Sequence, residues 1–491
     1  MPEQTLRKNA AIHPKIRLLA LLATSVFLAI LVAASASCGA ATTPGLSFRV
    51  AKRTSRYVIV ERQSQRLVVR RGDNIARAQG VPRYRVVERG RTYYVLVRLP
   101  APTSDPIAAM RNAKAGRTIV IGPGTYSGSV RVPSGVTILG SGMRATWIRG
   151  TICFNSNSAF SDLKIGPASA GKCAVYNASN TTSNTSFTRC RFRGGGGPVT
   201  GTYEDRQVIW LGHAVSNLTF TDCNVECNLG TENATHTIGY NNVYLQPDVV
   251  SPSIDNVLFR GCHFGVSNGV RDGAPQMNVC VYANNLLATR THGYRNVNFE
   301  NCVFEAADDE NIDYSGSALS TDTTTPNDGY SHVTGCVFKG NGKVALWFSD
   351  IVVEGGSGYI EVSGCTFYHG AGNAIAMEDN EHFGLNQNVN FHDNVIDATN
   401  AVLNTGITHT AYEYVGVVSN HNTVANNTII TLEKTPGITL KGDSNTVTGN
   451  RVTIASSGWY AIDIFSGSDN NTVTGNVLSM PVRDNGAGTV L

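Results

Sequence analysis

The chain has 491 residues, of which 42% are hydrophobic and 15% are charged. An average soluble domain carries roughly 25% charged residues, and low charge with ordinary hydrophobicity excludes an intrinsically disordered chain. The 50 glycines follow no Gly-X-Y period, which excludes a collagen-like protein. The net charge of +4 is unevenly distributed, because residues 1–99 sum to +14 and residues 100–491 sum to −10.

The first 40 residues have the pattern of an export signal. Lys15 and Arg17 precede an apolar run over residues 18–34, and small residues in an Ala-Ser-Ala pattern follow. We therefore predict a signal peptide over residues 1–40. A retained membrane anchor is an alternative, because the run is near the minimum length of a membrane span. A lipoprotein acylated at Cys38 is a third alternative. Each of them predicts a secreted or envelope-attached protein that meets the membrane only through this segment.

Residues 46–100 form a separate basic segment. Apolar and basic residues alternate over 56–62, 66–72 and 84–98, which predicts two β-hairpins in a small β module. Its arginines are either simply solvated or dock residues 51–99 onto an anionic envelope polymer or lipid. Nucleic acid is not an expected partner, because export separates the chain from it.

The strongest signal in the sequence is a repeat that begins at residue 187. Each copy is a short alternating strand, a marked Cys or Asn, and then a further apolar residue, as in Phe187-Thr-Arg-Cys190-Arg-Phe192. Ten copies occur at spacings of 23 to 40 residues, which predicts a solenoid. The marked residues are Cys190, Cys223, Cys262, Cys302, Cys336, Cys365, Asn394, Asn427, Asn450 and Asn476.

A second apolar strand follows most copies, as in Asn278-Val-Cys-Val-Tyr282. No helical period separates the strands, and Asn, Gly, Ser and Thr fill the connections. Short strands and polar turns predict an all-β solenoid. Its successive turns pair as parallel strands, with equivalent positions stacked about 4.8 Å apart.

Two segments near the start of the solenoid carry a family resemblance. Ala115-Gly-Arg-Thr-Ile-Val-Ile-Gly-Pro-Gly-Thr-Tyr126 and Val132-Pro-Ser-Gly-Val-Thr-Ile-Leu-Gly-Ser-Gly142 resemble the opening turns of right-handed parallel β-helix proteins of the pectate-lyase-like superfamily, which have the pectin lyase fold. In such proteins a short helix caps the first turn, and residues 105–114 fit that role, with Asp105 as N-cap and Pro106 at the first helical position. The resemblance implies a single-stranded right-handed parallel β-helix over residues 103–491. It leaves the function open, because the superfamily includes lyases, hydrolases, epimerases and non-enzymatic proteins.

Eleven cysteines in an exported chain first suggest disulfides. Six of them, however, occupy the marked position of the repeat, where Asn takes their place in the last four copies. We therefore expect this position to be an inward stacking column of buried thiols. Outside the column, Cys153 and Cys173 are the pair that we expect to form a disulfide. No Cys-x-x-Cys spacing occurs, so structural zinc is not expected.

Aligning the second strands predicts two columns of outward-facing residues. Aromatic rings beside carboxylates suit a sugar polymer, because rings stack on apolar sugar faces and acids bind hydroxyls or transfer protons. The first predicted column is Tyr244, Cys280, Asp313, Trp347, Ala376, Leu403, Thr439 and Asp463. The second is Gln246, Tyr282, Ser315, Ser349, Glu378, Thr405, Lys441 and Phe465.

These columns and the acidic residues beside them give the candidate site, with an extracellular polysaccharide as the expected partner. Asp308 and Glu310 are the candidate ligands of Ca²⁺, the expected metal ion, because hard cations prefer carboxylate oxygens. The candidate catalytic residues are Asp309, Asp313, Asp350 and Glu378, and the candidate substrate-binding residues are Tyr244, Tyr282, Trp347 and Arg271.

The reaction remains open between two types. A glycoside hydrolase needs two carboxylates roughly 5–9.5 Å apart, and Asp313 and Asp350 on neighbouring turns are the expected pair. A polysaccharide lyase or epimerase needs a base beside a uronate carboxylate and a cation such as Ca²⁺ to neutralise it. The rival interpretation is a non-catalytic surface protein that binds polysaccharide, with the acidic residues serving ordinary turn chemistry.

Overall fold

The chain divides into two compact units, Met1–Leu99 and Pro100–Leu491. Residues 1–40 lie outside the described residues, and no described helix is long and apolar enough to cross a membrane. The computed structural model describes residues 49–53, 57–62, 65–70, 83–88, 91–96, 102–168, 171–177, 181–195, 206–227, 241–245, 254–266, 277–283, 294–305, 310–316, 331–339, 349–354, 358–368, 373–378, 387–399, 413–431, 435–455 and 459–491.

The first unit contains a five-stranded sheet with the strand order β1-β2-β3-β5-β4. β2 pairs antiparallel with β1 and β3, β4 pairs antiparallel with β5, and β3 and β5 are parallel. The strands are β1 (Arg49–Arg53), β2 (Tyr57–Arg62), β3 (Gln65–Arg70), β4 (Arg83–Glu88) and β5 (Arg91–Leu96).

The second unit begins with the short helix α2 (Pro106–Arg111). The Asp105 side chain accepts a hydrogen bond from the backbone N–H of Ala108 at 3.0 Å, and Pro106 occupies the first helical position. Met110 is fully buried in the same core as the first strands of the solenoid. The predicted N-cap and start of this helix are confirmed.

Three parallel sheets of 13 strands follow, and each turn of the chain adds one strand to each sheet in a fixed order. Sheet 1 contains β6 (Thr118–Val120), β9 (Thr137–Leu139), β12 (Ala159–Ser161), β15 (Thr181–Thr188), β18 (Ala214–Thr221), β21 (Ile254–Arg260), β24 (Tyr294–Glu300), β27 (Ser331–Thr334), β30 (Gly358–Ser363), β33 (Gln387–His392), β36 (Thr423–Ala425), β39 (Thr446–Thr448) and β42 (Thr472–Thr474). Sheet 2 contains β7 (Gly124–Ser127), β10 (Thr146–Arg149), β13 (Lys164–Ile165), β16 (Arg191–Gly194), β19 (Asn224–Cys227), β22 (His263–Val266), β25 (Val303–Glu305), β28 (Val337–Lys339), β31 (Thr366–Tyr368), β34 (Val395–Ala398), β37 (Thr428–Thr431), β40 (Arg451–Ile454) and β43 (Val477–Leu478). Sheet 3 contains β8 (Val130–Arg131), β11 (Ile152–Phe154), β14 (Val175–Asn177), β17 (Ile209–Leu211), β20 (Asn241–Leu245), β23 (Met277–Ala283), β26 (Glu310–Gly316), β29 (Ser349–Glu354), β32 (Asn373–Met377), β35 (Val415–Val417), β38 (Ile438–Leu440), β41 (Ile462–Ile464) and β44 (Val482–Asp484).

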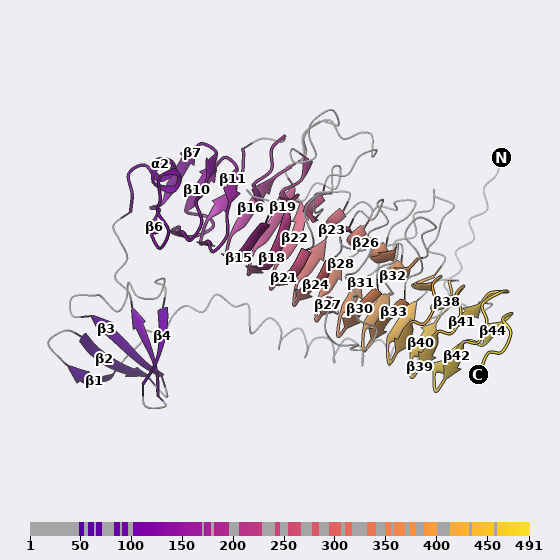
Figure 1. Ribbon diagram of the computed structural model, residues 1–491. Helices are drawn as coiled ribbons and strands as arrows, with labels where there is room; N and C mark the ends of the chain where they lie inside the picture. The colour runs from indigo at the N-terminus through magenta and orange to yellow at the C-terminus, as the bar shows by residue number, and fades with distance from the viewer. Residues whose placement is uncertain are drawn as a thin grey trace, which may run out of the picture. The chain divides into compact units, whose positions relative to one another are not determined.

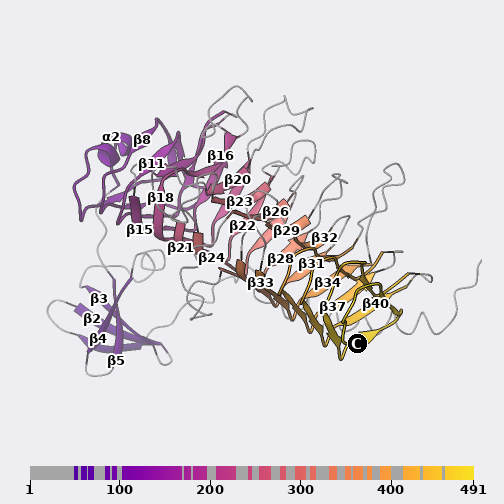
Figure 2. The same cartoon turned by 45° about the vertical axis from the view of Figure 1, so that its right-hand side comes forward.

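This arrangement is a parallel β-helix, and the sequence prediction of that fold is confirmed. Figure 1 shows the turns stacked in chain order from β6 to β44, and Figure 2 shows the strands of sheet 2 side by side from β28 to β40. Three parallel sheets joined in this way are consistent with a right-handed helix.

Stacked phenylalanines fill much of the core. Equivalent positions on paired parallel strands lie about 4.8 Å apart, so one apolar residue per turn becomes a continuous stack. Ring centroids lie 4.6–5.1 Å apart in sheet 1 and 4.7–4.9 Å apart in sheet 2. The sheet 1 stack is Phe160, Phe187, Phe220, Phe259 and Phe299, and the sheet 2 stack is Phe264, Phe304, Phe338 and Phe367.

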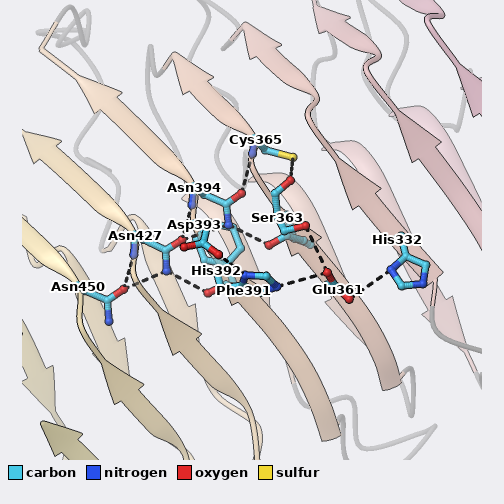
Figure 3. A network of polar contacts seen from close by, with 11 residues as sticks. His332, Glu361, Ser363, Cys365, Phe391, His392, Asp393, Asn394, Asn427 and Asn450 are labelled. Atoms are coloured by element: carbon cyan, nitrogen blue, oxygen red, sulfur yellow. Dashed lines mark hydrogen bonds and ion pairs between the residues drawn. The ribbon is translucent and has the colours of Figure 1, made fainter. Parts of the chain in front are cut away.

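The marked Cys and Asn residues of the repeat form one column, which is buried as predicted except at the partly exposed Asn476 in the last turn. The Cys365 thiol donates a hydrogen bond to the Val333 carbonyl in the preceding turn at 3.3 Å. Asn394 Nδ2 donates the equivalent bond to the Val362 carbonyl at 2.9 Å (Figure 3). Cys and Asn are therefore interchangeable here because both donate to the same backbone acceptor. The predicted disulfide is wrong, since Cys153 and Cys173 are both free thiols.

The connections around sheet 3 differ from the others in length. From β12 onward, two residues separate each sheet 1 strand from the sheet 2 strand that follows it, as between Thr188 and Arg191. Ten residues, 267–276, connect β22 to β23, and residues 284–293 connect β23 to β24. The longest connections therefore precede and follow the strands of sheet 3, so the residues that could form a binding site are most numerous beside this sheet.

Candidate functional site

The outward face of sheet 3 carries the predicted first column. In β17, Ile209 and Leu211 are fully buried in the core, whereas Trp210 between them is only partly buried. We call the residues at this position of each strand the sheet 3 outward column. In order of turns they are Arg131, Cys153, Tyr176, Trp210, Tyr244, Cys280, Asp313, Val352, Ala376, Gly416, Thr439, Asp463 and Arg483.

The register confirms part of the predicted column and corrects two positions. Tyr244, Cys280 and Asp313 follow one another in successive turns, as expected. Val352 pairs with Asp313 where Trp347 was predicted, and Gly416 stands where Leu403 was predicted. Val352 faces outward because the residues on either side of it in β29 face the core. Ile351 and Val353 are fully buried and pair with the buried Ile312 and Tyr314.

The second predicted column needs the same kind of correction. Ser349 pairs with Glu310, whereas Ser315 pairs with Glu354, so Glu354 occupies the position that was predicted for Ser349. Tyr282 lies in β23 and pairs with Ser315, but its side chain lies outside the described residues.

An aromatic group lies at the N-terminal side of the outward column. The ring centroids of Tyr176 and Trp210 are 6.4 Å apart, and Tyr244 is in register with Trp210 one turn further on. A Cβ atom at Gly212 would lie 2.1 Å from the Trp210 ring, so only glycine at this position allows the ring to lie there. Trp210 Nε1 is buried and has no hydrogen-bond partner among the described residues. Sequence reasoning missed Tyr176 and Trp210, which an earlier start of the strand alignment would have found.

Asp313 lies two turns beyond Tyr244 and is 5% exposed. The thiol of Cys280, in register one turn before it, donates a hydrogen bond to Asp313 Oδ2 at 3.3 Å. The residues on either side of Asp313 in β26 are fully buried in the core, so core packing holds the backbone that carries this carboxylate in place. A carboxylate held in a largely desolvated position is a typical candidate for proton transfer.

Asp350, the predicted partner of Asp313, lies in the next turn beside Ile351 and is bound within a buried network, so the predicted pair of carboxylates stays a prediction. Asp350 is fully buried and ends a ladder of side chains in which each amide Nδ2 donates to the next residue at 2.6 Å, namely Asn242, Asn278, Asn311 and Asp350. Burial raises the pKa of Asp350 from 3.8 to about 8, and the hydrogen bond from Asn311 opposes this only in part. A buried structural acid explains Asp350 better than a catalytic role does.

The other candidate site residues make few described contacts or lie outside the described residues. Glu378 is exposed directly after β32, and its N–H donates to the Val353 carbonyl at 2.8 Å. Glu310 begins β26 three residues before Asp313 and is partly buried. Arg271, Asp308, Asp309 and Trp347 lie outside the described residues. Among the residues that are described, no group of three His, Cys, Asp or Glu side chains is arranged to hold a metal ion, so the Ca²⁺ site stays a prediction.

A second polar cluster lies on sheet 1 and was not predicted from the sequence. Glu361 lies between His332 and His392, at 3.3 Å from an imidazole nitrogen of each, and His392 Nδ1 lies 2.7 Å from Asp393 Oδ2 (Figure 3). All four side chains are at least partly exposed, so we interpret the cluster as a surface ladder of polar contacts that contributes modestly to stability. Aligning the residues next to the marked positions across turns would have revealed it.

Three solved structures illustrate what this chain resembles. The A-module of mannuronan C-5 epimerase AlgE4 from Azotobacter vinelandii is 13% identical, with a TM-score of 0.38 over 80% of this chain and 97% of that one. The surface protein and adhesin PfbA of Streptococcus pneumoniae is 10% identical, with a TM-score of 0.42 over 79% and 94%. DFA-IIIase from Arthrobacter chlorophenolicus A6 is 13% identical, with a TM-score of 0.44 over 78% and 91%.

No protein-family model and no curated protein sequence matches the chain. Structural likenesses at these identities and TM-scores carry no information about activity. The assignment of the parallel β-helix therefore rests on the three sheets themselves, and the function has to be argued from the site.

Proposed function

We propose that this protein binds an extracellular carbohydrate polymer along the outward face of sheet 3, and that Asp313 acts on the bound chain as a general acid or base. One observation carries the proposal. Tyr176, Trp210, Tyr244, Cys280 and Asp313 occupy the same outward position in five successive turns. Four intervals of about 4.8 Å give this row a length of roughly 19 Å, which suits an extended chain better than a single small molecule.

The chemistry of the row fits sugars. Aromatic faces stack on the apolar C–H faces of pyranose rings, and an indole N–H donates hydrogen bonds to hydroxyls. Trp210 offers the first of these features, since its side chain is partly exposed.

The two reaction types make different demands on Asp313. A lyase requires a base that removes the proton beside a uronate carboxylate and a cation that neutralises that carboxylate, after which a C=C bond forms and the glycosidic oxygen leaves with a proton. Asp313 would supply the base, and the predicted Ca²⁺ ligands Asp308 and Glu310 would hold the cation. A hydrolase requires a second carboxylate within roughly 5–9.5 Å. Because Asp350 is buried in the Asn ladder, the second carboxylate would have to be Glu378, Glu310 or Asp309. We therefore favour the lyase type.

A second candidate function is binding without catalysis. The observation in its favour is that Asp313 is 5% exposed and already accepts a hydrogen bond from Cys280. In that case the aromatic row would retain the polymer at the cell surface, and the Cys280–Asp313 pair would stabilise the stacked turns.

The test uses the purified protein and a panel of neutral and uronate-containing polysaccharides, with and without Ca²⁺. Ultraviolet absorbance of unsaturated uronates and release of reducing ends are followed together. Both signals rise for a lyase, and only reducing ends rise for a hydrolase. Retention of a glycan without either signal would overturn the catalytic proposal and leave the binding function.

Variants separate binding from chemistry. We expect Trp210→Ala to weaken retention of the glycan about tenfold, because it removes one stacking surface. Tyr368→Ala is the matched control, since Tyr368 is an exposed aromatic residue on sheet 2. Asp313→Asn should abolish turnover while leaving retention unchanged. If Tyr368→Ala weakens retention as much as Trp210→Ala does, the assignment of the face is wrong.

A further inference from the structure

The β-helix is electrically asymmetric along its length. Residues 100–212 contain 12 Lys or Arg against 4 Asp or Glu, whereas residues 213–491 contain 10 against 28. The chain therefore begins its solenoid with a net charge of +8 and continues with −18. A surface of one charge sign concentrates ligands of the opposite sign, so the first turns are the place at which an anionic ligand would bind.

Four of these cations gather on the outward side of sheet 2. Trp147, Lys164 and Arg191 follow one another in register on β10, β13 and β16. Arg149 and Arg193 lie two residues further along β10 and β16. We call Arg149, Lys164, Arg191 and Arg193 the sheet 2 cationic cluster.

The Trp147 ring forms part of this surface. Lys164 Nζ lies 3.7 Å from the ring centroid and Arg149 Cζ lies 5.9 Å from it, so the ring faces stabilise both cations. Trp147 Nε1 donates to the Gly166 carbonyl at 2.9 Å, which fixes the orientation of the ring. The cations are thus held in a defined place rather than left as independent surface side chains.

Gly166 separates the two outer arginines. Its φ is +128°, and a Cβ atom there would lie 1.6 Å from the Arg193 carbonyl oxygen, so no other residue fits this backbone. The position between Arg149 and Arg193 on the neighbouring strands therefore carries no side chain. The two arginines therefore flank a strand position that has no side chain of its own.

Positive charge predominates within the cluster. Glu226 forms an ion pair with Arg191 at 2.7 Å, and Asp162 is bound by Arg189 at 2.7 Å outside the cluster. Arg149 and Lys164 add positive charge beyond the Arg191–Glu226 pair. Burial, and after it the repulsion from the nearby charges of Arg193 and Arg191, lowers the pKa of Lys164. An oxyanion bound among them would relieve this repulsion.

We propose that the sheet 2 cationic cluster binds the carboxylate or sulfate groups of an acidic polysaccharide. The cluster itself selects an oxyanion, because arginine forks and an ammonium group match its geometry. The choice of a polysaccharide as carrier rests on the proposed function, whereas the anion site does not. The cluster would hold a charged part of the polymer away from the acidic turns that surround Asp313.

The test measures binding of dextran sulfate and polygalacturonate, with uncharged dextran as the neutral polymer, at two salt concentrations. We expect the intact protein to bind the two polyanions and to lose affinity as salt rises. Lys164→Met combined with Arg193→Met should weaken binding at least about tenfold. Arg149→Met alters an exposed side chain and should weaken it several-fold without affecting folding.

Three controls keep the outcome decisive. Arg193→Lys retains the charge and should restore most of the binding. Arg451→Met removes an exposed cation from the same outward position of sheet 2 near the other end of the solenoid, and should change affinity less than twofold. Trp210→Ala should leave binding of dextran sulfate, which contains no uronate, intact, so failure of the sheet 3 site is distinguished from failure of the cluster. Equal losses with Arg451→Met and Arg149→Met would overturn the proposal, as would equally tight binding of polyglutamate.

Discussion

Replacing Asp350 with Asn tests the interpretation of the buried ladder. The pKa of Asp350 rises from 3.8 to about 8 because the carboxylate is fully buried. Since the folded-state pKa lies above the unfolded one, the protonated acid is favoured by folding. This contribution is complete below about pH 4 and is lost as the pH rises to about 8. A shift of about four units corresponds to roughly 5–6 kcal/mol.

The amide introduced by Asp350→Asn would keep the acceptor for Asn311 and could not ionise. We therefore expect Asp350→Asn and the native chain to have similar stability at pH 4. At pH 8 the variant should be more stable by up to the same amount, roughly 5–6 kcal/mol. Asp397→Asn is the matched control, because Asp397 is partly exposed on sheet 2 and the amide oxygen of Asn can still accept the hydrogen bonds that Thr399 donates to Asp397 Oδ1.

The assay is urea unfolding at pH values from 4 to 9, followed by tryptophan fluorescence and far-ultraviolet circular dichroism. Coincident curves from both probes and from both directions establish that equilibrium unfolding is being compared. Parallel pH profiles for the native chain and Asp350→Asn would refute the reasoning, because Asp350 would then carry no folding-linked proton.

Three further changes test the packing. Cys336→Asn should lower the free energy of unfolding by less than about 1 kcal/mol, because Asn can donate to the Phe299 carbonyl as the Cys336 thiol does at 3.5 Å. Cys336→Leu should lower it by about 1–3 kcal/mol through overpacking. Equal costs of the two variants in urea unfolding would contradict the hydrogen-bonded column of marked residues. Phe259→Ala should destabilise the protein by about 3–5 kcal/mol, since it interrupts a stack with centroid distances of 4.6 and 5.1 Å, and a cost below about 1 kcal/mol would show that the stack is not part of the core. Gly166→Ala should prevent formation of the first turns, seen as loss of soluble folded protein, and normal circular dichroism would show that the backbone there can adapt.

The β-helix could be predicted because the repeated residues are the ones whose side chains must stack between turns. An apolar residue recurs once per turn at each inward position, and a hydrogen-bond donor recurs at the marked column, so parallel stacking follows from the spacing alone. Tyr244, Cys280 and Asp313 were placed correctly because Asn278 and Asn311 mark the start of their strands in the same way.

The alignment failed where that marker changes. Asp350 takes the Asn position of the ladder in the next turn, and the run before it, residues 344–348, is as continuously apolar as residues 351–353 are. Period-two alternation cannot choose between two such runs, so Trp347 was assigned to the place of Val352.

Other features depended on contacts between turns that one strand alignment does not reveal. His332 and Glu361 come together because they are in register on sheet 1, whereas only the second strands had been aligned. The sheet 2 cationic cluster was hidden because charge was summed over the whole solenoid, where the acidic later turns outweigh the basic first ones.

The central claim is that the outward face of sheet 3 holds a carbohydrate chain, and affinity electrophoresis through gels containing each polysaccharide tests it most directly. The native protein and Tyr368→Ala should be retarded by the same glycan, whereas Tyr176→Ala combined with Trp210→Ala should migrate as it does in an empty gel. Retardation of the double variant equal to that of the native protein would contradict the account, because the binding surface would then lie elsewhere on the molecule.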